Sequence, residues 1–213
     1  MKSAVLFLTY KRFSTAEKVF ESIREAKPPR LYFASNAPNP ENKNEERLTE
    51  KVRGLLDRVD WNCEVHTLFR KEHLSVKYSI PSAIDWFFEN EEMGIILEDD
   101  CLPSQSFYPF CDELLDRYKD DHRIMHIAGI TYVEKPNNIE EYSYHFSRVG
   151  GIWGWASWKR AWKNYELEMQ SYPQASKEKI FDDLFIGENE IKELYLSWFK
   201  MAYRNTFTWD YQW

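Results

Sequence analysis

The sequence is poor in glycine and cysteine, and it contains no long apolar run. Its 7 glycines form no GxGxxG or GxxxxGKS stretch, which leaves a Rossmann dinucleotide site or a P-loop with little support. Apolar runs such as residues 4–8 and 94–97 fall far below the ~20 residues that cross a bilayer. The N-terminal run is also too short for a signal peptide. We therefore expect no transmembrane segment, while peripheral association with a membrane stays open.

Three cysteines make an odd number, and none of them is in a CxxC pair. This pattern predicts reduced thiols in a cytoplasmic protein and no zinc site. The cysteines are Cys63, Cys101 and Cys111.

The charge balance is acidic and the aromatic content is high. A formal net charge of −7 argues against the basic surface that nucleic-acid binding needs, so we expect no nucleic acid as a partner. Aromatic residues make up 17% of the chain, which argues against disorder. A length of 213 residues fits one α/β domain.

Strands and helices are predicted to alternate over the first 130 residues. Short apolar runs bounded by polar residues are typical of buried strands. Apolar residues at helical spacing lie between them, and Ser14 with Glu17 predicts a capping box at the first helix. The alternation predicts an α/β fold with a mostly parallel central sheet flanked by helices. The expected strands are 3–9, 31–34, 64–69, 94–97 and 124–128, and the expected helices begin near residues 14, 48, 79 and 107.

The pattern changes after residue 130. A polar stretch at 134–141 predicts a surface loop, and 142–146 predicts a strand. Residues 181–203 read as mostly helical. The chain ends in a Trp-rich segment that is typical of the middle of an element, so we expect the chain to be truncated at its C-terminus.

Three consecutive acids, Glu98, Asp99 and Asp100, follow the expected strand at 94–97. In open α/β sheets, ligands bind outside the carboxyl ends of the strands. Adjacent carboxylates repel one another unless a cation or hydrogen-bond donors compensate them. A hard divalent ion such as Mg²⁺ or Mn²⁺ would do so and would also clamp a diphosphate. The alternative is a solvated acidic loop.

Four tryptophans crowd the segment from Gly150 to Trp162. The last three, Trp155, Trp158 and Trp162, have the i, i+3, i+7 spacing of a helical core stripe. Trp153 instead lies among glycines, in a loop that lets the backbone approach a ligand closely. Core packing accounts for most of these rings, and Trp153 is the candidate for stacking on a sugar or a base.

A lone acid, Asp210, lies among aromatic residues near the C-terminus. Burial among aromatic rings disfavours the charged form of a carboxyl group, which is one way in which a general base is tuned. The alternative is an aspartate that caps a turn.

Five stretches occur in order along nearly the whole chain: AVLFLTYKR, RLYFASNAP, GIILEDDCLP, GGIWGWASWKRAW and TWDYQW. In this order the chain resembles the GT-A fold nucleotide-diphospho-sugar transferases, with a pattern similar to bacterial relatives of N-acetylglucosaminyltransferase I. The resemblance implies a single Rossmann-like GT-A domain over residues 1–213. Residues 1–130 would form the nucleotide-sugar-binding half and residues 131–213 the acceptor-side half.

The resemblance also implies an activity, a metal-dependent and inverting transfer of a sugar from a nucleotide-diphosphate donor, such as a UDP-sugar, to a glycan or another hydroxyl acceptor. Asp100 would bind Mn²⁺ or Mg²⁺ directly, Asp99 would face the ribose, and Glu98 would act through water or the base. Arg12 would lie near the nucleotide. Asp210 matches the position of a general base that deprotonates the acceptor.

Two departures from the family pattern bear on the donor. The chain has Asn36-Ala37-Pro38 where the family has Asp-Gly-Pro, so Asn36 would contact the nucleotide without a charge. The segment LSVKYSIPS replaces a Gly-rich helix entry, which changes the expected pocket.

Two other functions compete with glycosyl transfer. A sugar nucleotidyltransferase of the same fold would need a Gly-rich loop after the first strand, and the loop from Thr9 to Ser14 contains no glycine. A non-catalytic carbohydrate-binding protein would use the tryptophans and would have no need of the acidic triplet.

Overall fold

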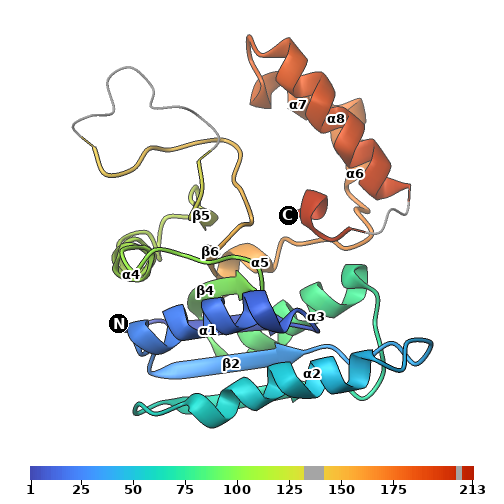
Figure 1. Cartoon of the computed structure of the whole chain (residues 1–213). Coiled ribbons are helices and arrows are strands. Elements are labelled where there is room, and N and C mark those ends of the chain that lie inside the picture. Colours follow the sequence, from blue (N-terminus) through green and yellow to red (C-terminus); the bar gives the residue numbers. More distant parts are fainter. Residues whose placement is uncertain (132–141, 205–207) are drawn as a thin grey trace. The chain divides into compact units, whose positions relative to one another are not determined.

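The computed structural model describes residues 1–131, 142–204 and 208–213 (Figure 1). They form two compact units. Unit 1 comprises Met1–Leu74 with Ala83–Lys163, and unit 2 comprises Ser75–Ser82 with Asn164–Trp213. The single domain expected from the sequence, with halves that meet near residue 130, stays a prediction.

Unit 1 is built on a six-stranded sheet with the order β3-β2-β1-β4-β6-β5. The first four strands along the chain run parallel, whereas β6 pairs antiparallel with both β4 and β5. This is the mostly parallel α/β sheet that the sequence predicts. The strands are β1 (Ala4–Thr9), β2 (Arg30–Ser35), β3 (Glu64–Phe69), β4 (Met93–Glu98), β5 (His126–Ala128) and β6 (Trp155–Trp158).

Helices follow the strands in alternation. They are α1 (Phe13–Ala26), α2 (Glu45–Arg53) with the 3₁₀ turn η1 (Gly54–Arg58), α3 (Val76–Asn90), α4 (Phe107–Arg117) and the short α5 (Lys159–Trp162). Both faces of the parallel strands are covered, which explains why β1 is buried along its whole length.

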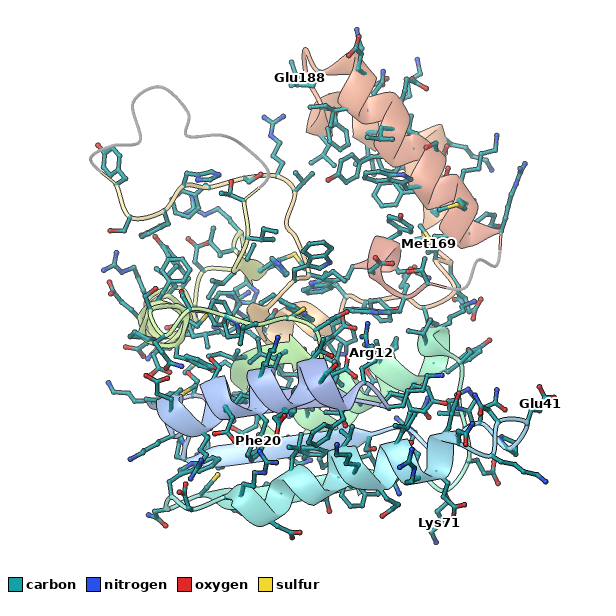
Figure 2. The ribbon with its side chains drawn as sticks, in the orientation of Figure 1. Arg12, Phe20, Glu41, Lys71, Met169 and Glu188 are labelled. Carbon is teal, nitrogen blue, oxygen red and sulfur yellow. The ribbon has the colours of Figure 1, made fainter. Side chains whose placement is uncertain are left out.

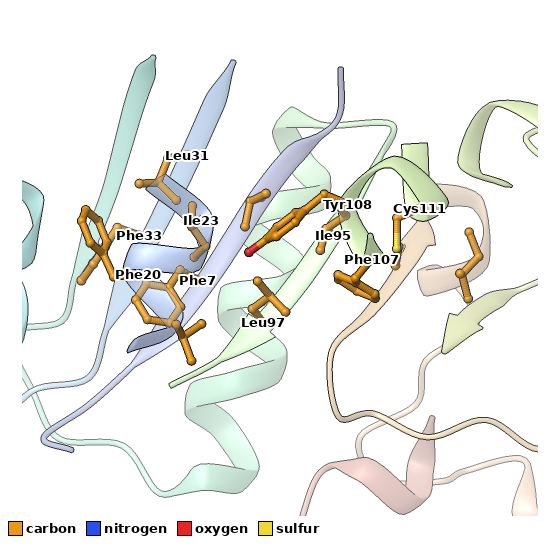
Figure 3. Packing of buried hydrophobic residues seen from close by; sticks show 14 of the residues in the cluster. Phe7, Phe20, Ile23, Leu31, Phe33, Ile95, Leu97, Phe107, Tyr108 and Cys111 are labelled. Carbon is orange, nitrogen blue, oxygen red and sulfur yellow. The ribbon is translucent and has the colours of Figure 1, made fainter. Parts of the chain in front are cut away.

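One face of the sheet packs against α1, α2 and α4 (Figure 3). Alternate residues of β1 and β2, such as Phe7 and Phe33, meet Phe20 of α1 and Tyr108 of α4 in one apolar cluster. Phe7 and Phe33 form an edge-to-face pair with ring centroids 5.5 Å apart. The side chains at every second position of these strands therefore pack against the apolar face of α1, as the sequence predicts.

The opposite face packs against the C-terminal part of α3. Tyr32 of β2 contacts Phe87 edge to face at 5.0 Å. Gly94 of β4 leaves the space that Phe87 fills, since a Cβ at Gly94 would lie 2.3 Å from Phe87 Cζ and 2.9 Å from the Ala4 carbonyl oxygen. The glycine is therefore required by close packing.

Three local predictions are wrong. Helix α1 begins at Phe13 with Arg12 as its N-cap, and no side chain caps it, so the Ser14–Glu17 box does not form. The described residues 142–146 form no strand. The strand expected at 124–128 is β5, which pairs with β6 in the antiparallel sense and so does not extend the parallel part of the sheet.

Two of the three tryptophans that have helical spacing lie in a strand. Trp155 and Trp158 lie in β6 and point to opposite faces, where Trp155 stacks on His126 and the Trp158 indole donates to the Leu115 carbonyl. Both rings are buried, as expected of core residues. Pairing with the buried strand β4 outweighs the helical spacing of the rings.

Unit 2 is helical in its described residues. It contains α6 (Tyr172–Lys177), α7 (Ile180–Leu184), α8 (Asn189–Tyr203) and the 3₁₀ turn η2 (Asp210–Gln212). Aromatic contacts hold these helices together, such as Phe181 on Phe199 at 5.3 Å and Phe185 on Tyr195 at 5.1 Å. None of the helices in the described parts of the chain has both the length and the apolar character needed to cross a membrane.

Candidate functional site

The carboxyl ends of β1, β2 and β4 meet at one edge of the sheet. Register pairs Leu8 with Glu98 and Thr9 with Ser35, so the segments after these three strands begin side by side. The chain leads from β1 to its neighbour β2 in one direction across the sheet and from β4 toward β5 and β6 in the other. Such a point of reversal is where open α/β sheets bind ligands.

Arg12 joins two carboxylates at this edge. Figure 2 shows Arg12 where α1 begins. Its Nε donates to Asp99 Oδ1 at 2.9 Å, and its Nη2 donates to the same oxygen. Its Nη1 lies 2.7 Å from Asp100 Oδ2. The guanidinium therefore supplies the compensating positive charge that the acidic triplet needs.

The two carboxylates differ in environment. Asp99 is 3% exposed, and its second oxygen accepts from the Tyr10 backbone N–H at 3.3 Å. Burial raises the pKa of Asp99, and the Arg12 charge opposes that shift. The Asp100 side chain is 44% exposed. Asp99 is therefore a fixed group of the fold, while Asp100 faces solvent.

The divalent cation that the resemblance implies would need oxygen ligands at this edge of the sheet. The described residues contain no group of three or more His, Cys, Asp or Glu that could hold a metal by themselves. Mg²⁺ is commonly held by one or two carboxylates together with substrate phosphates and water. Asp100 offers a solvent-facing hard oxygen of that kind, so the site is compatible with a cation shared with a diphosphate.

A second buried carboxylate, Glu45 at the start of α2, fastens the segment after β1. It accepts hydrogen bonds from the Tyr10 hydroxyl, from Lys11 Nζ and from the Asn39 backbone N–H. Lys11, the Tyr10 hydroxyl and the Asn39 N–H together lower the pKa of Glu45 to about 2. Burial and the neighbouring Glu45 raise the pKa of Tyr10 to about 12. Residues 10–12 are therefore held by side chains on both sides.

Asn36 follows β2 at the same edge. Its Oδ1 accepts from the backbone N–H groups of Ala37 and Leu74, and its Nδ2 donates to the Leu74 carbonyl at 2.8 Å. The amide thus ties the loop after β2 to the loop after β3. Its predicted contact with the nucleotide stays a prediction.

Trp153 and Glu98 belong to the same edge. In the antiparallel pair, Trp155 lies opposite Ile96, so the chain before Trp155 and the chain after Ile96 leave the sheet together. Trp153 is 64% exposed, and Gly154 next to it has a φ of +71°, which a side chain would strain. An exposed indole beside the acidic turn is a platform for a planar or ring-shaped ligand.

Asp210 lies in unit 2, at the first position of η2. Its carboxylate accepts a hydrogen bond from the Thr208 hydroxyl, and burial raises its pKa. Around it, Trp209 is buried and Tyr211 stacks on Trp198 at 5.4 Å. The environment has the aromatic character that the sequence predicts, while the role of Asp210 as a base stays a prediction.

Other reactive groups are held in inert forms. Burial lowers the pKa of His126 to about 4, and its Nε2 lies 3.0 Å from the Gly151 carbonyl oxygen. Burial raises the pKa of Cys101 to about 12, which keeps this thiol protonated. His126 is therefore neutral but a weak base at neutral pH, and the protonated thiol of Cys101 is not a nucleophile.

Sequence analysis did not identify Glu45, Tyr10 and Lys11 as a group. Glu45 lies in the charged run ENKNEER, which is typical of a solvated loop. Its burial arises from the return of this loop over the end of β1, a contact that no local pattern encodes. The only signal is the basic pair Lys11-Arg12 directly after a buried strand.

No family model and no curated protein matches the chain. Solved structures overlap it weakly. HddC from Yersinia pseudotuberculosis is 13% identical with a TM-score of 0.37, over 54% of this chain and 55% of that one. UDP-glucose pyrophosphorylase complexed with UDP-glucose is 12% identical with a TM-score of 0.36, over 60% and 56%. The chain thus spans about half the length of these two proteins.

A third structure, 4-diphosphocytidyl-2C-methyl-D-erythritolsynthase from Anaerococcus prevotii DSM 20548, covers more of the chain. It is 9% identical with a TM-score of 0.45, over 84% of this chain and 78% of that one. Structural similarity at this level says nothing about the activity of this chain. None of the three names is that of an N-acetylglucosaminyltransferase, so the comparisons give no support to that finer resemblance.

Proposed function

We propose that the chain is an enzyme that binds a nucleotide-diphosphate sugar, together with a divalent cation, at the edge where β1, β2 and β4 end. The observation that carries the proposal is the convergence of Arg12, Asp99 and Asp100 at the reversal point of the sheet. A buried acid, a guanidinium and a solvent-facing acid together suit a ligand with both anionic phosphates and a bound cation.

As its reaction we propose the transfer of the sugar to a hydroxyl acceptor. The acceptor oxygen forms a bond to the anomeric carbon, the bond from that carbon to the β-phosphate oxygen breaks, and the nucleoside diphosphate leaves with the electron pair. Asp210 takes the acceptor proton. A bound divalent cation supplies positive charge to the leaving diphosphate. Asp100 would hold it, and a single displacement of this kind inverts the anomeric centre.

A nucleotidyltransferase is the second candidate, since the named solved structures include a pyrophosphorylase and a diphosphocytidyl synthase. That reaction joins a nucleoside triphosphate to a sugar phosphate and releases pyrophosphate. It requires a cradle for the triphosphate after the first strand. Here Lys11 is engaged by Glu45, and the loop has no glycine. We therefore rank glycosyl transfer first.

One assay distinguishes the two reactions by their products. The protein is incubated with Mn²⁺ and either a panel of nucleotide-diphosphate sugars or UTP with a sugar 1-phosphate. Glycosyl transfer releases nucleoside diphosphate from the first set, and nucleotidyl transfer releases pyrophosphate from the second. Release of pyrophosphate alone would overturn the glycosyl assignment, and release of neither product would count against both.

Trp153 provides a test of the binding mode. If its exposed indole stacks on the donor, its fluorescence is quenched when nucleotide sugar and Mn²⁺ are added together, and Trp153→Ala weakens binding by a factor of about 5–100. Glycan binding with no response to metal or nucleotide would favour a non-catalytic carbohydrate-binding protein. A Trp61→Phe variant is the matched control, because Trp61 donates to the Pro28 carbonyl, far along the strands from this edge.

A further inference from the structure

The guanidinium of Arg12 has two edges with different partners. Nε and Nη2 face Asp99, and Nη1 faces Asp100. Asp99 is buried and its other oxygen is held by the Tyr10 N–H, whereas the Asp100 side chain is 44% exposed. One half of the ion-pair network is therefore anchored in the fold and the other half lies in solvent.

The two halves differ in how readily they break. Removing the partner of a buried carboxylate leaves an uncompensated charge in the protein interior, so the Arg12–Asp99 contact is retained. An exposed ion pair contributes little because water and salt screen it, so the Arg12–Asp100 contact is exchangeable. Breaking the second contact does not disturb the first, because different nitrogens make them.

We propose that Arg12 occupies Asp100 in place of the divalent cation when the site is empty, and that its Nη1 passes to the diphosphate when the cation binds Asp100. Cation and nucleotide binding are then coupled, since the cation frees a donor that the phosphates use. The inference rests on the proposed function and concerns its regulation. It makes Arg12 a ligand-binding residue that opposes binding of the cation alone and favours binding of the cation together with the nucleotide.

The test uses Arg12→Lys, because one ammonium can stay on Asp99 but cannot reach both acids in the same way. Free Mn²⁺ is measured by electron paramagnetic resonance, first with protein alone and then with UDP. We expect Arg12→Lys to bind Mn²⁺ alone more tightly than wild type, by up to about fivefold. We expect it to bind UDP in saturating Mn²⁺ about tenfold more weakly, through loss of a charge-assisted hydrogen bond.

Arg24→Lys is the matched control, since Arg24 lies on the same helix and pairs with Glu21 and Asp60 on the surface. Opposite changes for the two ligands in Arg12→Lys alone support the proposal, because damage to the fold would weaken both. Unchanged or weaker Mn²⁺ binding by folded Arg12→Lys overturns it. Failure of wild type to bind Mn²⁺ even with UDP refutes the proposed function instead.

A measurement on wild type covers the case in which Arg12→Lys does not fold. Arginine side-chain NMR signals are followed while Mg²⁺ and UDP are added together. We expect the Arg12 Nη1 signals to shift while the Nε–H signal stays in place. Movement of Nε–H, or no change at either position, overturns the proposal.

Discussion

Replacing Arg12 should lower the stability of the fold more than replacing its partner Asp99. Arg12→Gln leaves the Asp99 carboxylate buried with no counter-charge, whereas Asp99→Asn leaves a guanidinium that is half exposed and can be solvated. Loss of the partner of a buried charge costs about 3–5 kcal/mol, and we expect the lower end because water reaches Arg12. At about 2–4 °C per kcal/mol for a domain of this size, Arg12→Gln should lower Tm by about 6–12 °C. Asp99→Asn should lower it by less than half of that.

The pH dependence of this deficit follows from the Asp99 carboxyl group. Burial raises its pKa in the folded protein, and loss of Arg12 raises it further. The folded state then holds its proton at pH values where the unfolded chain, with a pKa of about 3.9, has lost it. Stability therefore falls as pH rises from about 4 through the folded pKa, so the Arg12→Gln deficit shrinks when pH is lowered from 7 to 5.

Thermal and urea unfolding at pH 5 and pH 7 test both expectations. The Arg12→Gln/Asp99→Asn double variant should be more stable than Arg12→Gln at pH 7, since it removes the unpaired charge. Equal losses for the two single variants, or a deficit that does not depend on pH, would refute the reasoning.

Three further predictions concern the core, the thiols and the proposed base. Gly94→Ala should lower the free energy of unfolding by about 1–3 kcal/mol, because the added Cβ meets Phe87 and a backbone oxygen. Urea unfolding measures this loss. An unchanged free energy would show that the sheet shifts to make room for the Cβ. Tm should be the same with and without strong reductant, because the three cysteines are free thiols; a large drop would reveal a disulfide. Asp210→Asn should lower transfer by about 10²–10⁴-fold with Tm and UDP binding retained, as measured by product release, whereas a fall in Tm with full specific activity would assign Asp210 to the fold.

The parallel core was predictable because its strands are buried on both sides. Such strands must be continuous apolar runs, and β1 and β4 are. The edge strand β3 was also predicted, although none of its residues is fully buried. The acidic turn was found because three acids after a buried strand are chemically costly without a partner.

The remaining features depend on contacts between distant segments. Arg12 pairs with acids 87 and 88 positions away, and α1 begins directly after it at Phe13, without the cap expected at Ser14. Trp155 and Trp158 lie in β6, which pairs with β4, although their spacing is typical of a helix. Local sequence patterns predict neither feature, because each depends on which distant segment packs beside it in the folded chain.

Calorimetric titration of UDP tests the central claim most directly. Wild type is titrated in Mn²⁺ and in EDTA, and Asp100→Asn is titrated in Mn²⁺ beside Asp120→Asn, which alters an exposed acid elsewhere on the surface. We predict binding by wild type and Asp120→Asn in Mn²⁺, and affinity at least about tenfold lower in EDTA and in Asp100→Asn. Equal affinity in all four titrations would contradict a cation-dependent nucleotide site at the end of β4.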